Sequence, residues 1–190
     1  VLSNLACRAP VGAGALTMDG SMSGQAGSPA YNLVLIAQDV PIQALVAFAR
    51  HAKKDIPDDL VAGGKLDAHV KLRREGEAGK SGVLWQGGGE TLGFRLGSKL
   101  TKTELTLDRI PFAVSQGADL ESREKSVWRR AISEIEQSPT QTHVDIGPFN
   151  LALGRPTPAV LRGWISRSRY SLLIHGDAQV QRLLQAARTV

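Results

Sequence analysis

The residues that could do chemistry are few and lie far apart in the sequence. The glycines in Val11-Gly-Ala-Gly-Ala-Leu-Thr17 match only the first two positions of a dinucleotide-binding fingerprint, because Thr17 stands where the third glycine belongs. Ser122-Arg-Glu-Lys125 matches the Ser-x-x-Lys of penicillin-recognising enzymes, but the companion Ser-Asp-Asn and Lys-Thr-Gly motifs are missing. The first segment is therefore read as a turn between strands, and the second as a chance match.

Histidine and cysteine do not form a predicted metal site either. The four histidines, His51, His69, His143 and His175, have no spacing typical of metal ligands. Cys7 is the only cysteine, so no internal disulfide can form, and a small buried side chain is its expected role. The sequence thus predicts no catalytic residues, no metal and no cofactor, and the chain is predicted not to be an enzyme.

The charge of the chain favours anionic partners, with a solvated surface that binds no partner as the alternative. The formal net charge is +5, which suits phospholipid head groups, lipopolysaccharide or nucleic acid. Aromatic residues make up only 5% of the chain, and no motif places several of them on one strand for base stacking. Lipid is therefore favoured as the anionic partner over nucleic acid.

Two segments of the chain have similar sequences. Tyr31-Asn-Leu-Val-Leu-Ile-Ala-Gln-Asp39 resembles Tyr170-Ser-Leu-Leu-Ile-His-Gly-Asp177, and a matching amphipathic segment follows each aspartate. Upstream, residues 18–23 pair loosely with residues 161–166. Each copy is predicted to form a strand, a turn, a strand and a short helix. The two similar units lie near residues 15–53 and 158–190.

The residues between the two units alternate between apolar and polar types. Residues 66–73 place leucine, alanine and valine on one face and charged residues on the other, as a half-buried strand requires. Gly87-Gly-Gly89 is predicted to form a tight bend, and Asp108-Arg109 a turn, between further strands. Short strands at this spacing predict a mainly β fold with short helices (α+β), built on an antiparallel meander sheet.

Apolar residues recur at helical spacing in three segments. Residues 42–53 and 179–189 each have an apolar face, and Asp39 and Asp177 are expected to bind free amides of the first turn. Residues 122–136 show the same spacing and predict a further helix, with a mobile insertion between strands as the alternative. The chain is interpreted as a single β-rich segment, 1–190, of a larger protein. It has no apolar run near the roughly 20 residues that span a bilayer, so any membrane anchor is expected outside it.

Residues 31–50 and 154–190 resemble the AsmA-like family of bacterial envelope proteins. The resemblance rests on the strand that leads into Asp39-Val-Pro41 and its helix, on Ile56-Pro57 followed by Leu60-Val-Ala-Gly-Gly-Lys-Leu-Asp67, and on Gly154-Arg-Pro-Thr-Pro158 with the strands after it. It implies a long, curved β-sheet forming an apolar groove for phospholipid between the inner and outer membranes. It also implies a periplasmic location, with an inner-membrane anchor in a region outside these residues. The segment at 122–136 has no counterpart in the family.

Two functions from different classes are therefore carried forward. The first is a structural or lipid-transfer segment of an AsmA-like cell-envelope protein, which holds or guides phospholipid in outer-membrane biogenesis. Its partners are phospholipid or another anionic lipid, other segments of the same protein, and the membrane through parts outside these residues. The alternative is a non-catalytic protein-interaction module that docks partners through its amphipathic helices. The candidate groove residues, which could equally form a closed core beneath the helices, are Leu33, Leu35, Leu66, Val70, Leu72, Leu105 and Leu107.

Overall fold

Segments in which apolar and polar residues alternate form β-strands, since alternation directs successive side chains to opposite faces. The structure is a computed structural model that describes residues 2–25, 28–52, 59–74, 83–98, 100, 103–116, 142–166 and 169–187. The strands are β1 (Leu2–Val11), β2 (Gly14–Gln25), β3 (Ser28–Pro41), β4 (Leu60–Arg74), β5 (Leu84–Ser98), β6 (Thr103–Gln116), β7 (Thr142–Leu151), β8 (Ala159–Ser166) and β9 (Tyr170–His175). The helices are α1 (Ile42–Ala52) and α3 (Val180–Ala187).

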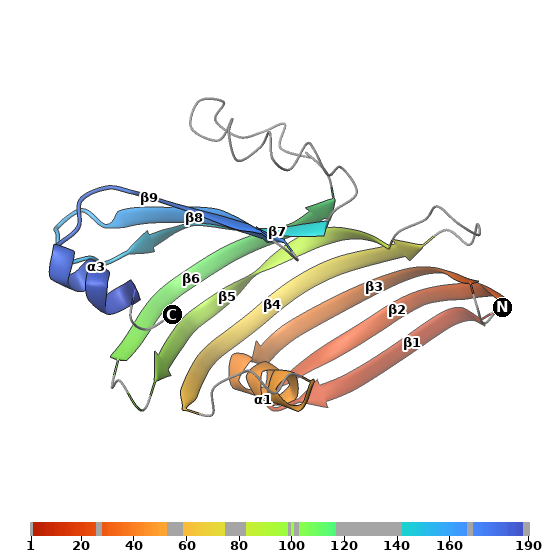
Figure 1. The fold of residues 1–190 in the computed structure, drawn as a ribbon. Helices are drawn as coiled ribbons and strands as arrows, with labels where there is room; N and C mark the ends of the chain where they lie inside the picture. Colours follow the sequence, from red (N-terminus) through yellow and green to blue (C-terminus); the bar gives the residue numbers. More distant parts are fainter. Residues whose placement is uncertain are drawn as a thin grey trace.

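The nine strands form one antiparallel sheet, in which each strand pairs with the next one along the chain (Figure 1). The sheet is open, with β1 at one edge and β9 at the other. The prediction of a mainly β fold, with an antiparallel meander and short helices, is confirmed. The helix predicted at 122–136 lies outside the described residues.

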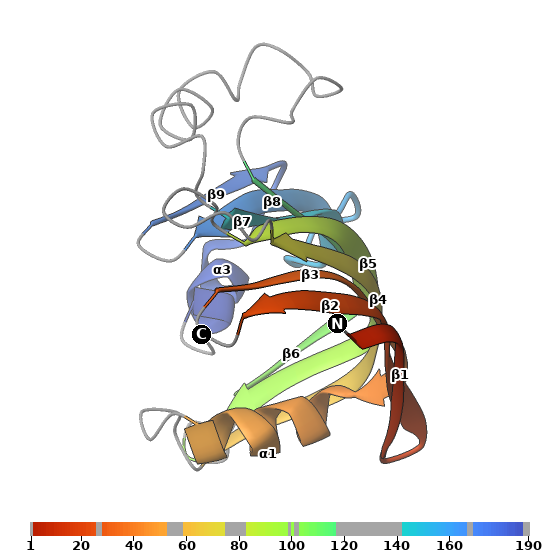
Figure 2. The same cartoon turned by 90° about the vertical axis from the view of Figure 1, so that its right-hand side faces the viewer.

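The sheet is strongly curved, and both helices lie on its concave side (Figure 2). Ala178, just before α3, packs against the cluster of Leu107, Leu151 and Ala159, so these residues point to the concave side. Paired residues of an antiparallel sheet point to the same side, so the strand registers extend this assignment to the other strands. We call this side the inner face: Leu5, Cys7, Ala9, Leu16, Met18, Met22, Tyr31, Leu33, Leu35, Ala37, Val40, Ala62, Leu66, Ala68, Val70, Leu72, Trp85, Thr91, Phe94, Leu96, Leu105, Leu107, Ile110, Phe112, Val114, Val144, Ile146, Phe149, Leu151, Ala159, Leu161, Ile165, Tyr170, Leu172 and Ile174, with intervening glycines.

Register shifts keep apolar side chains on the inner face along the whole length of the strands. The register of β3 against β4 shifts between Ala37 and Val40, so that both of these buried residues point inward. The register of β4 against β5 shifts near Gly93, and the register of β7 against β8 shifts between Ile146 and Phe149. Because a bulge bends its strand and increases the local twist, these shifts also contribute to the curvature.

Two predicted reversals of the chain were wrong. Gly87–Gly89 does not form a bend but lies inside β5, where a Cβ added at Gly89 would overlap the carbonyl oxygen of Asp67 on β4. Asp108 and Arg109 do not form a turn but lie inside β6. Glycine in β5 therefore permits the close approach of a neighbouring backbone and does not reverse the chain.

Most of the buried apolar residues collect at the end of the sheet where the helices lie; Leu72 on β4 and Trp164 on β8 are buried farther along their strands. Val40, Ile42 and Ala62 are buried where β3 leads into α1 and β4 begins. The second group is Leu107, Leu151, Leu153 and Ala159, and the backbone N–H of Gln179 donates to the carbonyl of Leu153 at 2.9 Å. The helices thus close one end of the inner face over a core.

Candidate functional site

The candidate site is the inner face itself, because it is apolar across the whole width of the sheet. Away from the strand ends, Thr91 is the polar exception among its side chains. The ionisable side chains of β4 that alternate with the apolar ones, Lys65, Asp67, His69, Lys71 and Arg73, point to the outer side. Alternation along each strand therefore sorts the sheet into one apolar and one largely polar side.

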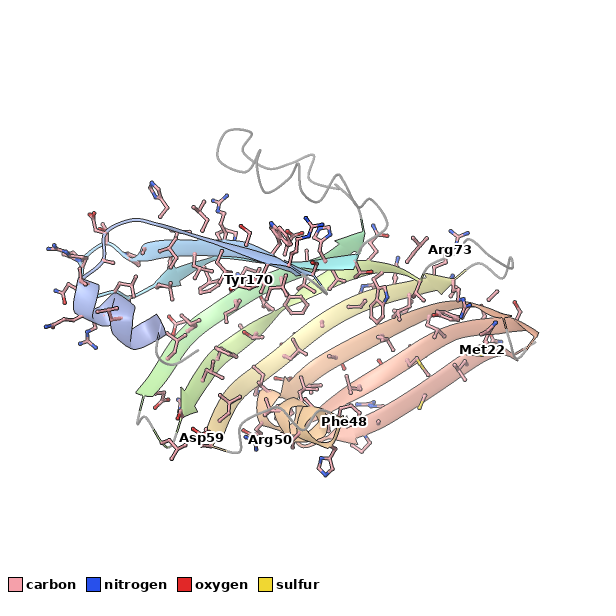
Figure 3. The ribbon with its side chains drawn as sticks, in the orientation of Figure 1. Met22, Phe48, Arg50, Asp59, Arg73 and Tyr170 are labelled. Carbon is pink, nitrogen blue, oxygen red and sulfur yellow. The ribbon has the colours of Figure 1, made fainter. Side chains whose placement is uncertain are left out.

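Beyond the core at the helix end, the inner face is only partly covered. Leu33, Leu35 and Val70 are half-buried, although they lie in the middle of the sheet. The side chains on β9 are more exposed: Tyr170 by 74%, Leu172 by 54% and Ile174 by 44%. Figure 3 shows the side chains along the sheet, with Met22 of β2 and Tyr170 of β9 labelled toward its two edges. A half-covered apolar surface of this width is typical of a binding surface and not of a solvent-facing one.

The structure places all the predicted groove residues on the inner face, in two groups. The β3 and β4 residues lie side by side, because Leu33 pairs with Leu72, Leu35 pairs with Val70, and Leu66 pairs with Val40. The other two, on β6, lie toward the helix end: Leu107 is buried in the core cluster and Leu105 packs against it. Leu107 and Leu72 are buried, whereas the other five candidates are half-buried.

Sequence reasoning missed the aromatic and methionine side chains of the same face. Met18, Trp85, Phe94 and Phe112 point inward beside the predicted leucines. Strict alternation along β5 would direct Trp85 and Phe94 to opposite sides of the sheet. Both point inward because the register shift near Gly93 lies between them. The inward position of Met18 could have been predicted from the internal similarity, because Met18 aligns with Leu161, which also points inward.

The outer side carries a network of charges near the start of α1. The Nζ atom of Lys65 donates to Oδ1 of Asp39 at 2.8 Å, and the backbone N–H of Asp39 donates to Oδ1 of Asp67 at 2.8 Å. The expectation that Asp39 caps the helix was wrong, because β3 continues to Pro41 and the Asp39 carboxylate binds Lys65. The hydrogen bond from Asp39 and its negative charge raise the pKa of Lys65 above its usual 10.5.

Replacing Lys65 is expected to have a small, pH-dependent effect on stability. Because the folded-state pKa is raised, the contribution of Lys65 is complete below pH 10.5 and is lost as the pH rises through the folded-state pKa. Lys65→Met should therefore lower the melting temperature slightly at about pH 8, and the difference should shrink as the pH rises above the usual pKa of 10.5. Parallel thermal unfolding of the variant and the original chain measures this, and a difference that grows with pH would contradict it.

A buried polar cluster lies on the outer side of β7 and β8. His143 and Asp145 are buried, with Nε2 of His143 3.4 Å from Oδ2 of Asp145, and Trp164 is the residue paired with Asp145. His69 and His175 are exposed on the outer side, and Nδ1 of His51 on α1 lies 2.7 Å from the carbonyl oxygen of Ala47. Within the described ranges, no group of three or more histidine, cysteine, aspartate or glutamate side chains could hold a metal ion.

The expectation for Cys7 was wrong. Its thiol is exposed, although its pairing with Met18 places it on the inner face. The reason is its position on β1, which is an edge strand of the sheet that the described residues form. The alternation of residues along β1 predicts the side of the sheet on which Cys7 lies, but it does not predict whether other residues cover that side chain.

Comparisons with protein-family models, with curated proteins and with solved structures gave no significant match to the chain. Of the helices in the described residues, none is long and apolar enough to cross a membrane.

Proposed function

We propose that the inner face holds the acyl chains of a phospholipid or another anionic lipid. The chain would then be a structural or lipid-transfer segment of an AsmA-like cell-envelope protein that works in outer-membrane biogenesis. The observation that carries the proposal is the apolar side of the sheet, which continues across nine strands and stays half-exposed beyond the helices. Burial of an acyl chain yields about 0.8 kcal/mol per CH₂, so such a face can retain lipid without any reactive residue.

A basic residue stands at the end of the inner face that is remote from the helices. Arg74, the last residue of β4, pairs with Tyr31 of β3 and is half-buried. A guanidinium group binds phosphate oxygens through paired N–H donors. The proposal therefore places the acyl chains along β3 and β4 and the anionic head group near Arg74.

The location and further partners follow from the same proposal. A segment of this kind would act in the bacterial periplasm. It would contact other segments of the same protein, and it would reach the membrane through parts outside these 190 residues. The net charge of +5 suits the anionic lipids of that compartment.

The test is to purify the chain from bacteria, extract it with organic solvent and measure phospholipid per protein by mass spectrometry. Leu35→Asp and Val70→Asp should each lower the bound lipid about tenfold, because a carboxylate in an apolar contact must give up its hydration. The matched control is Ile36→Asp, which changes the next residue of the same strand on the outer side. Circular dichroism of each variant establishes that the sheet is intact.

Three results would overturn the proposal. The first is no more lipid on the chain than on an unrelated protein purified from the same lysate. The second is equal lipid on the inner and outer aspartate variants. The third is loss of lipid from the Ile36→Asp control alone.

One observation favours the protein-interaction alternative. Phe48 on α1 is 76% exposed, so the helix presents an aromatic side chain that the sheet does not cover (Figure 3). An exposed aromatic residue of this kind is common in protein interfaces. A chain that retains no lipid but loses a bound protein on Phe48→Asp would support this function in place of lipid binding.

A further inference from the structure

The two similar units of the chain have the same strand register. In the first unit Met18 pairs with Leu35, Gly20 with Leu33 and Met22 with Tyr31. In the second unit the corresponding pairs are Leu161 with Ile174, Gly163 with Leu172 and Ile165 with Tyr170. A Cβ at Gly20 or Gly163 would overlap the backbone of the next strand, so both units use glycine at the same place for the same close approach. The units are therefore comparable residue by residue.

The first unit has a neighbour at a place where the second has none among the described strands. β4 pairs with β3 through Tyr31–Arg74, Leu33–Leu72 and Leu35–Val70, whereas β9 is the edge of the sheet. The β3 side chains are half-buried, and the corresponding β9 side chains, Tyr170, Leu172 and Ile174, are exposed. The added exposure lies where a counterpart of β4 would stand.

The helices show the same difference independently. Ile42, at the start of α1, is 8% exposed, and Nη2 of Arg50 donates to the carbonyl of Leu60 at the start of β4 at 2.6 Å. Val180, the counterpart of Ile42 in α3, is 70% exposed, and Leu184 is 53% exposed. Within the described part of the chain, the helix of the second unit thus has no counterpart of the contacts that β4 gives to the first.

We propose that the free edge of β9 accepts an antiparallel polypeptide strand with the residue pattern of β4. The strand would place apolar residues opposite Tyr170, Leu172 and Ile174 and charged residues on the outer side, as Val70, Leu72 and their neighbours do against β3. The unpaired N–H and C=O groups of an edge strand supply the affinity, and the alternate side chains supply the register. This inference concerns a protein contact and does not depend on lipid binding.

The test appends a copy of residues 56–74 after Val190 of the full chain. Seven residues, 53–59, separate α1 from β4, and 188–190 together with the appended 56–59 give the same spacing after α3. Hydrogen exchange measured by mass spectrometry should slow about tenfold or more over Tyr170–His175, because the β9 amides gain carbonyl partners. The matched control carries aspartate in the appended copies of Leu66, Val70 and Leu72.

The outcomes separate the proposal from its competitors. Slowed exchange in the extended chain but not in the aspartate control supports the proposal, and Leu172→Asp in the extended chain should abolish the effect. Unchanged exchange, or equal slowing in the control, would overturn it. Concentration-dependent protection of β9 in the chain without the extension would also overturn it, because the edge would then take a second copy. Lipid content, measured on the same samples, reports on the proposed function separately.

Discussion

Gly89→Val is expected to lower the free energy of unfolding by about 3 kcal/mol. Two effects of opposite sign act at this position. Valine favours extended backbone over glycine, but the whole strand-propensity scale spans only about 1 kcal/mol. The new Cβ would overlap the carbonyl oxygen of Asp67 and crowd Ala68, both of which belong to the adjacent β4. Since β5 pairs on both sides, neither neighbour can withdraw without losing its own hydrogen bonds. The overlap should outweigh the gain in strand propensity, so the free energy of unfolding should decrease.

Urea denaturation followed by far-ultraviolet circular dichroism measures this loss, and Gly93→Asn on the same strand provides the control. Gly93 has a φ of +58°, and a Cβ built there has no atom within 4 Å. Asparagine tolerates this backbone conformation, so the control should change stability by less than about 1 kcal/mol. If both variants were equally unstable, the close approach of β4 to β5 at Gly89 would not be the cause.

Leu107→Ala is expected to cost about 2–4 kcal/mol, because it removes a buried side chain from the core beside α3. Leu107 is 5% exposed and lies in one cluster with Leu151, Leu153 and Ala159. These partners lie on β7, on β8 and in the segment between them, so they cannot all move into the space that Leu107 leaves. A cavity should therefore remain after the truncation. The same denaturation experiment gives the loss.

Leu35→Ala is the matched comparison, since it makes the same chemical change on the partly open part of the inner face. Leu35 is half-buried and faces Met18 and Val70, so its truncation should cost about 1 kcal/mol. A cost at Leu35 equal to that at Leu107 would mean that both positions are enclosed to the same degree. The distinction between core and partly open face would then fail.

Local patterns in the sequence were sufficient to predict the class of the fold. Alternation in residues 66–73 predicted a half-buried strand, and β4 places Leu66, Val70 and Leu72 on one side as expected. The apolar spacing after Pro41 predicted the helix that begins at Ile42. Both signals are local, because each is set by the geometry of a single strand or helix.

The errors concern features that depend on a neighbouring strand. Gly87–Gly89 was predicted as a bend because glycine often marks turns, but its role here is to admit the backbone of β4. Asp39 was predicted as a helix cap from its position alone, whereas Lys65, 26 residues later, binds its carboxylate. Neither contact can be derived from a short window of sequence.

The sequence was sufficient to predict which leucines point to the inner face, but not how completely each of them is enclosed. Alternation selected inward-facing leucines, yet it could not show that Leu107 is enclosed while Leu33 and Leu35 remain partly open. Enclosure depends on where α1 and α3 lie against the sheet, which is a tertiary property. The inward position of Phe94 likewise depends on the register shift near Gly93.

The pairing of each strand with its immediate successor has a consequence for growth of the molecule. Among the nine described strands, none lies between two that follow each other in the sequence, so hairpins can be duplicated or deleted without altering the connections of the rest. Neighbouring strands are about 4.8 Å apart, so each added hairpin widens the sheet by about 10 Å. Gene duplication can therefore adjust the span of such a protein in regular increments, and contacts between sequence neighbours allow each increment to fold soon after synthesis.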